Sequence, residues 1–452
     1  MRKSNFTPRV YRVSELIDIE ILDIGDGYRA KNSEMSNEGL PFARAGNIND
    51  GFHFESADWL GHDGVVRAAE KISKPGDVLF TSKGTVGRFA LVKEETPQFV
   101  YSPQLCYWRS KEHSILYPEF LYYWMSSPGF ISQINSVKGQ TDMADYVNLR
   151  DQRMMYIQIP PLSHQQKIAT ILSSLDNKIE LNRQMNRTLE QMARALFKSW
   201  FIDFDPVYAK QRGEKPEGMD AEIAALFPNR FVEIDEKEVP EGWSITSIEE
   251  LAESIFSGGT PDTRKPEYWN GSIPWFSSGE TRNSFIIKTE KTITPAGLEN
   301  SSTRPIRKKD ILVASAGQGF TRGQTSFNMI DAYINQSVVA IRTNLRKVSP
   351  EWLYINISGR YEEMRGLSDG HSSRGSLTTK IIAQMPVALA PQKITGAYTA
   401  IVEGLIERQV NNMREIDQLA SLRDSLLPRL LSGELDVSDW ETAVEAAEAT
   451  FA

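Results

Sequence analysis

The chain has very few of the residues that build disulfide frameworks and metal centres. Its 452 residues include a single cysteine, Cys106, and only five histidines. One cysteine cannot form an intrachain disulfide or a multi-cysteine zinc site, and the histidines do not occur at metal-ligand spacings. We therefore expect no disulfide and no metal site. Cys106 stands in an apolar run that reads as a strand, which favours a buried, unreactive side chain.

Long apolar runs and sorting signals are also missing. No apolar stretch approaches the roughly 20 residues that span a bilayer, and residues 1–10 lack the apolar segment of a secretory signal. Apolar residues nevertheless make up 40% of the chain, enough for packed cores. These features predict a soluble, cytoplasmic protein without a membrane partner.

The motifs of several common chemistries are absent. The sequence contains neither a Gly-x-x-x-x-Gly-Lys-Ser/Thr phosphate loop nor a Gly-x-Ser-x-Gly nucleophile turn. Residues 317–319 resemble the start of a dinucleotide-binding turn, but Arg322 stands where the third glycine belongs. We expect no catalytic activity from this chain alone.

The net charge of −8 counts against a nucleic-acid partner, but the charge is unevenly distributed. Residues 432–452 hold six acidic residues and no basic one, so the remainder carries −8 + 6 = −2. A local basic cluster stands against that background: Arg304, Arg307, Lys308, Lys309 and Arg322. Overall acidity therefore argues against DNA binding by this chain alone without excluding it.

An internal repeat organises the chain. Residues 41–47 return as 274–280, residues 76–84 as 309–317, and residues 118–122 as 350–354, a spacing of about 230 residues. Apolar and backbone-setting positions are kept, whereas the polar side chains between them change. The sequence therefore predicts one scaffold that is present twice with two different surfaces.

Two long helical patterns accompany the repeat. Residues 164–201 contain no glycine or proline and place apolar residues at heptad positions a and d, with Asn182 and Asn186 in mid-seam. The pattern after residue 392 repeats this, with Gln409 and Asn412 at the matching depth. Because a buried asparagine fixes helix register, we expect the two helices to pack against each other. Separate amphipathic helices, each packed on its own domain, are the alternative.

Together these patterns predict an α+β fold. Two repeated mixed α/β domains are joined by two long antiparallel helices in a coiled-coil spacer with a pseudo-two-fold relation. We expect the first domain at residues 1–163, the central helix at 164–203, a charged connector at 204–240, the second domain at 241–391, the distal helix at 392–433 and an acidic tail at 434–452.

Polar loops at equivalent places in the two copies are the candidate recognition elements. Residues 83–88 match 316–322, and residues 138–142 and 370–374 precede the two long helices. Glycines let backbone N–H groups approach a phosphate, while arginine, lysine and amide side chains can contact phosphates or base edges. A plain surface turn explains any one loop equally well, but recognition better explains the shared pattern. The candidate DNA-contacting residues are Arg44, Asn47, Lys83, Thr85, Arg88, Gln140, Ser277, Ser278, Gln318, Arg322, His371 and Arg374.

Three runs, residues 160–168, 175–182 and 195–207, closely resemble the central region of type I restriction–modification specificity subunits. Residues 273–279 and 426–435 also look like motifs of that family. The resemblance covers almost the whole chain and implies two target-recognition domains separated by long helices.

The resemblance implies a non-catalytic subunit that reads double-stranded DNA at two separated half-sites. It also implies docking of modification (methyltransferase) subunits and, through them, restriction subunits. S-adenosylmethionine, ATP and Mg would belong to those partners, with no cofactor bound by this chain. We expect Leu196, Phe197, Trp200 and Phe201 to be exposed and to form the partner interface, because they exceed what one antiparallel helix covers. A coiled-coil scaffold without sequence readout is the alternative function.

Overall fold

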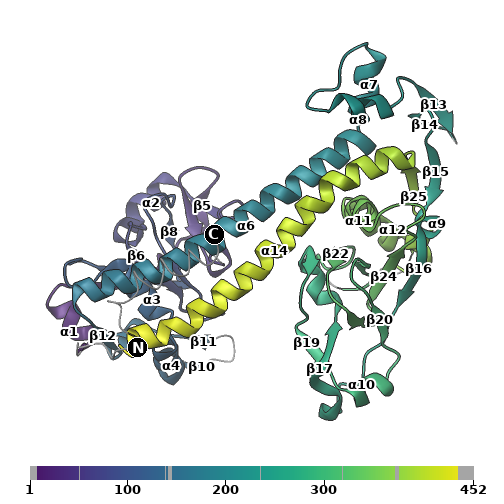
Figure 1. The fold of residues 1–452 in the computed structure, drawn as a ribbon. Helices are drawn as coiled ribbons and strands as arrows, with labels where there is room; N and C mark the ends of the chain where they lie inside the picture. Colours follow the sequence, from purple (N-terminus) through teal and green to yellow (C-terminus); the bar gives the residue numbers. More distant parts are fainter. Residues whose placement is uncertain are drawn as a thin grey trace. The chain divides into compact units, whose positions relative to one another are not determined.

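The computed structural model describes residues 8–49, 51–137, 139–140, 145–234, 236–317, 319–371 and 376–435 (Figure 1). The chain forms two compact units. Residues 1–179 and 418–452 make the first unit, and residues 180–417 make the second. Each long helix therefore contributes to both units.

The first unit contains two four-stranded sheets. Neighbouring strands of the sheet β2-β9-β6-β7 are antiparallel, whereas β4 and β8 of the sheet β3-β5-β4-β8 run parallel. The strands are β2 (Leu22–Asp26), β3 (Met35–Ser36), β4 (Leu40–Ala43), β5 (Asp58–Leu60), β6 (Asp77–Thr81), β7 (Phe89–Leu91), β8 (Val100–Tyr101) and β9 (Leu105–Ser110).

The first unit also contains short helices, and a two-stranded ladder pairs β1 with β12. The helices are α1 (Val13–Asp18), α2 (His62–Ala68), α3 (Pro118–Met125), α4 (Pro128–Val137) and α5 (Leu149–Arg153), and the remaining strands are β1 (Arg9–Arg12), β10 (Gly139–Gln140), β11 (Asp145–Tyr146) and β12 (Tyr156–Ile159). Cys106 of β9 is buried, as its apolar run predicts.

The second unit repeats this plan with a five-stranded sheet, β16-β24-β21-β22-β18, and a four-stranded sheet, β19-β17-β23-β20. The parallel pair β17–β23 stands where the first unit has β4–β8. The strands are β16 (Ala252–Ser257), β17 (Trp269–Phe276), β18 (Phe285–Ile286), β19 (Lys291–Ile293), β20 (Arg304–Ile306), β21 (Ile311–Ala314), β22 (Thr325–Asn328), β23 (Ala332–Ile334) and β24 (Val338–Thr343).

A further ladder pairs β15 with β25, the counterpart of β1–β12. Its strands and the helices of this unit are β15 (Ser244–Ser247), β25 (Pro386–Leu389), α9 (Ile248–Leu251), α10 (Pro295–Glu299), α11 (Pro350–Ser358), α12 (Tyr361–His371) and α13 (Thr379–Ala383). Strands β6 and β21 are buried at every position, and after the aspartate the repeated runs read Val-Leu-Phe-Thr and Ile-Leu-Val-Ala without a polar–apolar alternation.

A buried ion pair shows the repeat at atomic detail. In the first unit Asp77 accepts two hydrogen bonds from Arg109, with Nε–Oδ1 at 2.6 Å and Nη2–Oδ2 at 2.7 Å. In the second unit Asp310 accepts the same two bonds from Arg342, at 3.0 and 2.7 Å. The backbone N–H three residues before each aspartate also donates to it at 2.8 Å. Bidentate pairing compensates the cost of burying both carboxylates.

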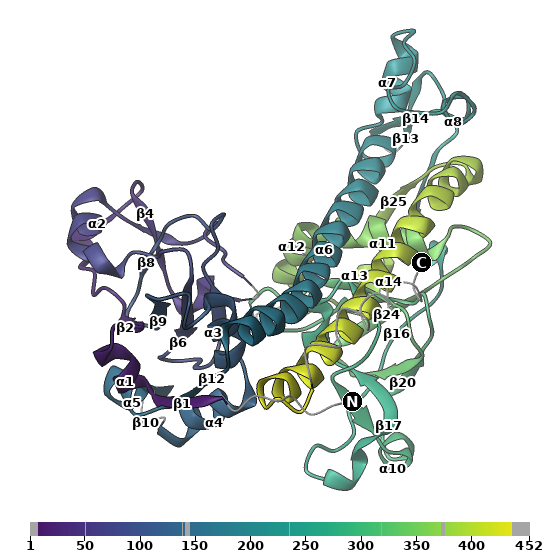
Figure 2. The same cartoon turned by 60° about the vertical axis from the view of Figure 1, so that its left-hand side comes forward.

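The long helices are α6 (Leu162–Phe201) and α14 (Gln392–Leu431), each 40 residues long. In the second unit the Tyr398 hydroxyl donates to the carbonyl of Ala193 at 2.9 Å, and Asn412 Nδ2 donates to Asn186 Oδ1 at 2.8 Å. As the residue number rises along α14 it falls along α6, so the helices are antiparallel and lie side by side (Figure 1; Figure 2). The predicted packing of the two seams is confirmed.

The same helices also pair within the first unit. Ile168 and Leu172 of α6 share a core with Leu426 and Leu430 of α14. Arg423 Nη1 lies 2.7 Å from Asp176 Oδ1 beside that core. Helix α6 begins two residues earlier than the expected residue 164, directly after Pro161.

The expected connector, residues 204–240, contains regular secondary structure. It forms α7 (Asp205–Gln211), α8 (Ala221–Leu226) and the hairpin of β13 (Phe231–Ile234) with β14 (Lys237–Pro240). Its charge, proline and glycine content suggested a linker, but Pro206 occupies the first turn of a helix, where proline is favourable. Phe227 packs edge-on against Trp200 with ring centroids 5.3 Å apart, which anchors the segment.

The expected exposure of the aromatic end of α6 is wrong. Phe197, Trp200 and Phe201 are only 5%, 3% and 3% exposed, and Leu196 is half-buried against the same core. Helix α14 covers part of this face, and Trp352 of α11 packs on Phe197 with ring centroids 5.6 Å apart. These side chains are therefore core residues of the second unit. Because they are not exposed, the argument that they form a partner interface loses its basis.

Candidate nucleic-acid interface

Three loops meet in the first unit. The β6–β7 loop (residues 82–88) lies against the turn after β4, where Arg88 Nη1 donates to the carbonyl of Ala45 at 3.0 Å. The segment before α5 joins it, because the N–H of Val147 donates to the carbonyl of Ser82 at 2.9 Å. The structure therefore brings the expected loop at residues 83–88 together with the turn after β4 and with the segment that follows residues 138–142, of which only 139 and 140 are described.

The second unit gathers its loops in the same way. The β21–β22 loop (residues 315–324) contacts the 3₁₀ turn η5 (Ser278–Arg282), where the Thr281 hydroxyl donates to Gln324 Oε1 at 3.2 Å. The N–H of Leu377 donates to the carbonyl of Ser315 at 2.9 Å, the counterpart of the bond between Val147 and Ser82. Two equivalent loop clusters are thus built from different side chains.

Lys83 and Thr85 are the exposed candidate residues of the β6–β7 loop. The flanking Gly84 and Gly87 have positive φ of +85° and +101°, so glycine is needed there for backbone conformation although space is open around both. Arg88 is half-buried, and one of its guanidinium nitrogens holds the neighbouring turn. The loop is therefore fixed in shape and presents one cation and one hydroxyl to solvent.

Asn47 does not have the free amide that a base contact requires. Its Oδ1 accepts the N–H of Arg44 at 2.8 Å and its Nδ2 donates to the carbonyl of His53 at 2.9 Å, with the residue 9% exposed. In this structure Asn47 holds the turn, and its contact with DNA stays a prediction. Arg44 is exposed and forms an ion pair with Asp58 at 2.6 Å.

The corresponding turn of the second copy uses a carboxylate for the same purpose. The N–H and the hydroxyl of Ser277 lie 2.9 and 3.2 Å from Glu280 Oε1. Burial raises the pKa of Glu280 against the lowering effect of these bonds. The Ser277 hydroxyl is thus engaged internally, whereas Ser278 begins η5 and is half-buried.

Arg322 is also engaged within the protein. It is 8% exposed, and its guanidinium forms an ion pair with Asp369 of α12. The pair ties the β21–β22 loop to α12, and contact of Arg322 with DNA stays a prediction. Of the remaining candidates, Gln140 lies in β10 and His371 ends α12, while Gln318 and Arg374 lie outside the described residues.

Comparison with known proteins identifies the repeated scaffold. Residues 9–191 and 240–419 each match the type I restriction modification DNA specificity domain. The chain belongs to this family. It is 28% identical over 410 residues to the HindI specificity subunit of Haemophilus influenzae, covering 81% of this chain and 88% of that protein. It is 24% identical over 384 residues to the MjaIX specificity subunit of Methanocaldococcus jannaschii, covering 83% and 81%.

A solved structure shows the same fold. The type I restriction–modification S subunit from M. genitalium superposes with a TM-score of 0.56 at 15% identity, covering 94% of this chain and 96% of that one. The resemblance and the fold class inferred from the sequence are therefore confirmed. The two loop clusters are parts of two DNA specificity domains.

Sequence reasoning missed two features of the second specificity domain. The first is Phe320, at the tip of the β21–β22 loop, which is 83% exposed. The sequence pattern that could have indicated it is an aromatic residue that follows Gly317 and Gly319 in a loop. A cavity of about 660 Å³ also opens between the long helices and β18. Its lining includes four cationic side chains, Arg183, Arg187, Arg282 and Lys288.

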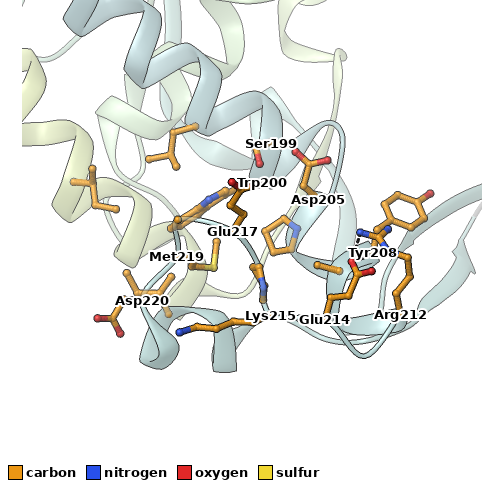
Figure 3. A pocket seen from close by; sticks show the side chains of 17 residues that line it. Ser199, Trp200, Asp205, Tyr208, Arg212, Glu214, Lys215, Glu217, Met219 and Asp220 are labelled. Atoms are coloured by element: carbon orange, nitrogen blue, oxygen red, sulfur yellow. Dashed lines mark hydrogen bonds and ion pairs between the residues drawn. The ribbon is translucent and has the colours of Figure 1, made fainter.

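The folded connector of this family member contains a second cavity, of about 880 Å³, between the end of α6, α7 and α8 (Figure 3). Figure 3 shows Trp200 and Met219 lining it beside the charged side chain of Lys215. The ion pair of Arg212 with Glu214, at 2.7 Å, lies at one side. Among the described residues no group of His, Cys, Asp and Glu is arranged to hold a metal ion, and no helix is long and apolar enough to cross a membrane.

Proposed function

We propose that this chain is the DNA-reading subunit of a type I restriction–modification complex, in which each specificity domain reads one of two separated half-sites. One observation carries the proposal: two copies of one scaffold, each with the same buried Asp–Arg pair, carry different side chains on equivalent loops. A scaffold conserved in its interior and varied at one surface is what recognition of two different ligands requires.

The chemistry of the loops suits DNA. Lys83 offers an exposed ammonium that can contact a phosphate, and Thr85 offers a hydroxyl and a backbone N–H between two glycines of positive φ. The second cluster lacks a counterpart of Lys83, because Ala316 stands at that place. Since the two clusters present different groups, the two half-sites should differ in sequence.

The chain itself would transfer no methyl group. Binding of S-adenosylmethionine, ATP and Mg is assigned to partner modification and restriction subunits. Incubating the purified chain with DNA and labelled S-adenosylmethionine should give no methylation, while addition of modification subunits should give it. Methyl transfer by the chain alone would contradict the assignment.

A domain exchange tests the readout. The methylation motif is mapped in cells that carry this chain with its partners and in cells where residues 241–391 come from another specificity subunit. We expect a motif of two half-sites, of which only one changes on exchange. A single continuous motif, or a change in both halves, would contradict the proposal, and an unchanged motif would favour a scaffold without readout.

A further inference from the structure

Phe320 has the largest exposed fraction, 83%, of the large apolar side chains in the part of the chain that the structure describes. Single exposed apolar residues are common on proteins and need no explanation by themselves. The position of this one is unusual, because it stands at the tip of a loop in the candidate DNA interface. Its ring is thus displayed where the proposed function places DNA.

The loop is built to hold that tip in place. Gly317, Gly319 and Gly323 have φ of +143°, +64° and +89°, values that other residues rarely adopt. The hydroxyl of Tyr361 donates to the carbonyl of Phe320 itself at 2.9 Å.

Helix α12 supports the same loop from two further positions. Arg365 Nη1 donates to the carbonyl of Gly319 at 2.7 Å, and Asp369 pairs with Arg322. Tyr361, Arg365 and Asp369 are spaced by four residues, so all three lie on one face of the helix. The backbone is therefore tied down on both sides of Phe320 while its ring remains in solvent.

We propose that Phe320 enters a base step of the second half-site and stacks on an unstacked base. This inference rests on the proposed function and extends it to a mode of readout. Aromatic rings stack on any base, and apolar wedges of this kind open a step at an energetic cost that depends on its sequence. A loop held rigidly before binding keeps the cost of ordering the ring small.

The β6–β7 loop of the first unit carries no exposed aromatic residue at the matching place. It carries Val86, which is half-buried and packs onto the core of the first unit. Base unstacking by this device should therefore occur in one half-site only. If exposed apolar groups merely bound DNA in general, unstacking would not be confined to one half-site, so this difference between the half-sites distinguishes the two explanations.

The test uses the complex of this chain with its modification subunits and a duplex containing the mapped site. Phe320→Ala and Phe320→Trp are compared with Leu345→Ala, a matched control that alters a residue 73% exposed in the turn after β24. Kd is measured by fluorescence anisotropy at several salt concentrations. 2-Aminopurine placed at successive positions reports unstacking at each step.

We expect Phe320→Ala to weaken binding about 5- to 150-fold, the range that corresponds to loss of one base–aromatic stack. The salt dependence should not change, because no charge is removed. The 2-aminopurine signal should disappear at one step of the second half-site, and Phe320→Trp should retain it. Leu345→Ala should match the unchanged protein in Kd and signal.

Three outcomes would overturn the wedge: an unchanged Kd and signal for Phe320→Ala, a uniform loss of affinity with the signal retained, or impaired assembly with modification subunits in the absence of DNA. Failure of the unaltered complex to prefer its site over random DNA would instead count against the proposed function. Thermal unfolding of each variant is measured as a control, and we expect an unchanged melting temperature because the replaced side chain is exposed.

Discussion

Replacement of Asn412 by alanine tests what fixes the register of the two long helices. Asn412 is 1% exposed, and its Nδ2 donates to Asn186 Oδ1 at 2.8 Å. Asn186 in turn donates to the carbonyl of Gln409 at 3.2 Å. The asparagine pair is thus one connected polar layer in a seam that also buries Asn182 and Gln409.

Asn412→Ala leaves Asn186 Oδ1 without its donor. A buried polar atom that loses its partner costs about 1–3 kcal/mol, and because Asn186 is itself only half-buried we expect about 1–2 kcal/mol. Replacing both residues by leucine removes both polar groups together, so the double variant should be less destabilised than the sum of the single variants. The coupling should be at least about 1 kcal/mol.

Urea unfolding followed by circular dichroism gives these free energies, provided that the slope of the transition is the same in each variant. Asn411→Ala is the matched control, since Asn411 is an exposed asparagine on the same helix and should change stability by less than about 0.5 kcal/mol. If Asn412→Ala behaves like Asn411→Ala, or if the two leucine substitutions are additive, the polar layer does not determine the register.

Further predictions concern the core, the buried ion pair and the first loop cluster. Trp200→Ala should destabilise the second unit by about 3–5 kcal/mol, because it removes a buried ring that packs on Phe227 and Tyr398. An unchanged melting temperature with lost partner binding would restore the interface interpretation. Arg342→Ala should cost about 3–5 kcal/mol by leaving the Asp310 carboxylate buried without its cation, and Arg342→Lys should recover only part of this loss in urea unfolding because lysine cannot form the bidentate pair. Lys83→Ala should weaken DNA binding for all sequences alike and reduce the salt slope by about one, as measured by anisotropy titrations; a changed motif with an unchanged slope would mean that Lys83 reads a base.

The sequence by itself determined the features that depend on periodicity and on backbone requirements. The heptad pattern placed Asn186 and Asn412 in one seam, and the helix pairing followed, because a 3.6-residue period leaves a single apolar face on each helix. The repeat placed Asp77 and Asp310 at the same position of two equivalent strands. The family resemblance followed from continuous sequence motifs, residues 160–168, 175–182 and 195–207, which need no tertiary structure to be read.

Only the tertiary structure decided which side chains remain available at the surface. Arg322 looks like a free loop cation in the sequence, whereas in the structure it is buried and pairs with Asp369, 47 residues away. Trp200 looks like an exposed helix end until Phe227 and the second long helix cover it. Conversely, the exposure of Phe320 requires that no other segment packs over its loop. Local sequence patterns indicate the periodicity of apolar residues and the backbone conformation of a segment. The burial of a side chain depends on contacts with segments distant in sequence, which no local pattern contains.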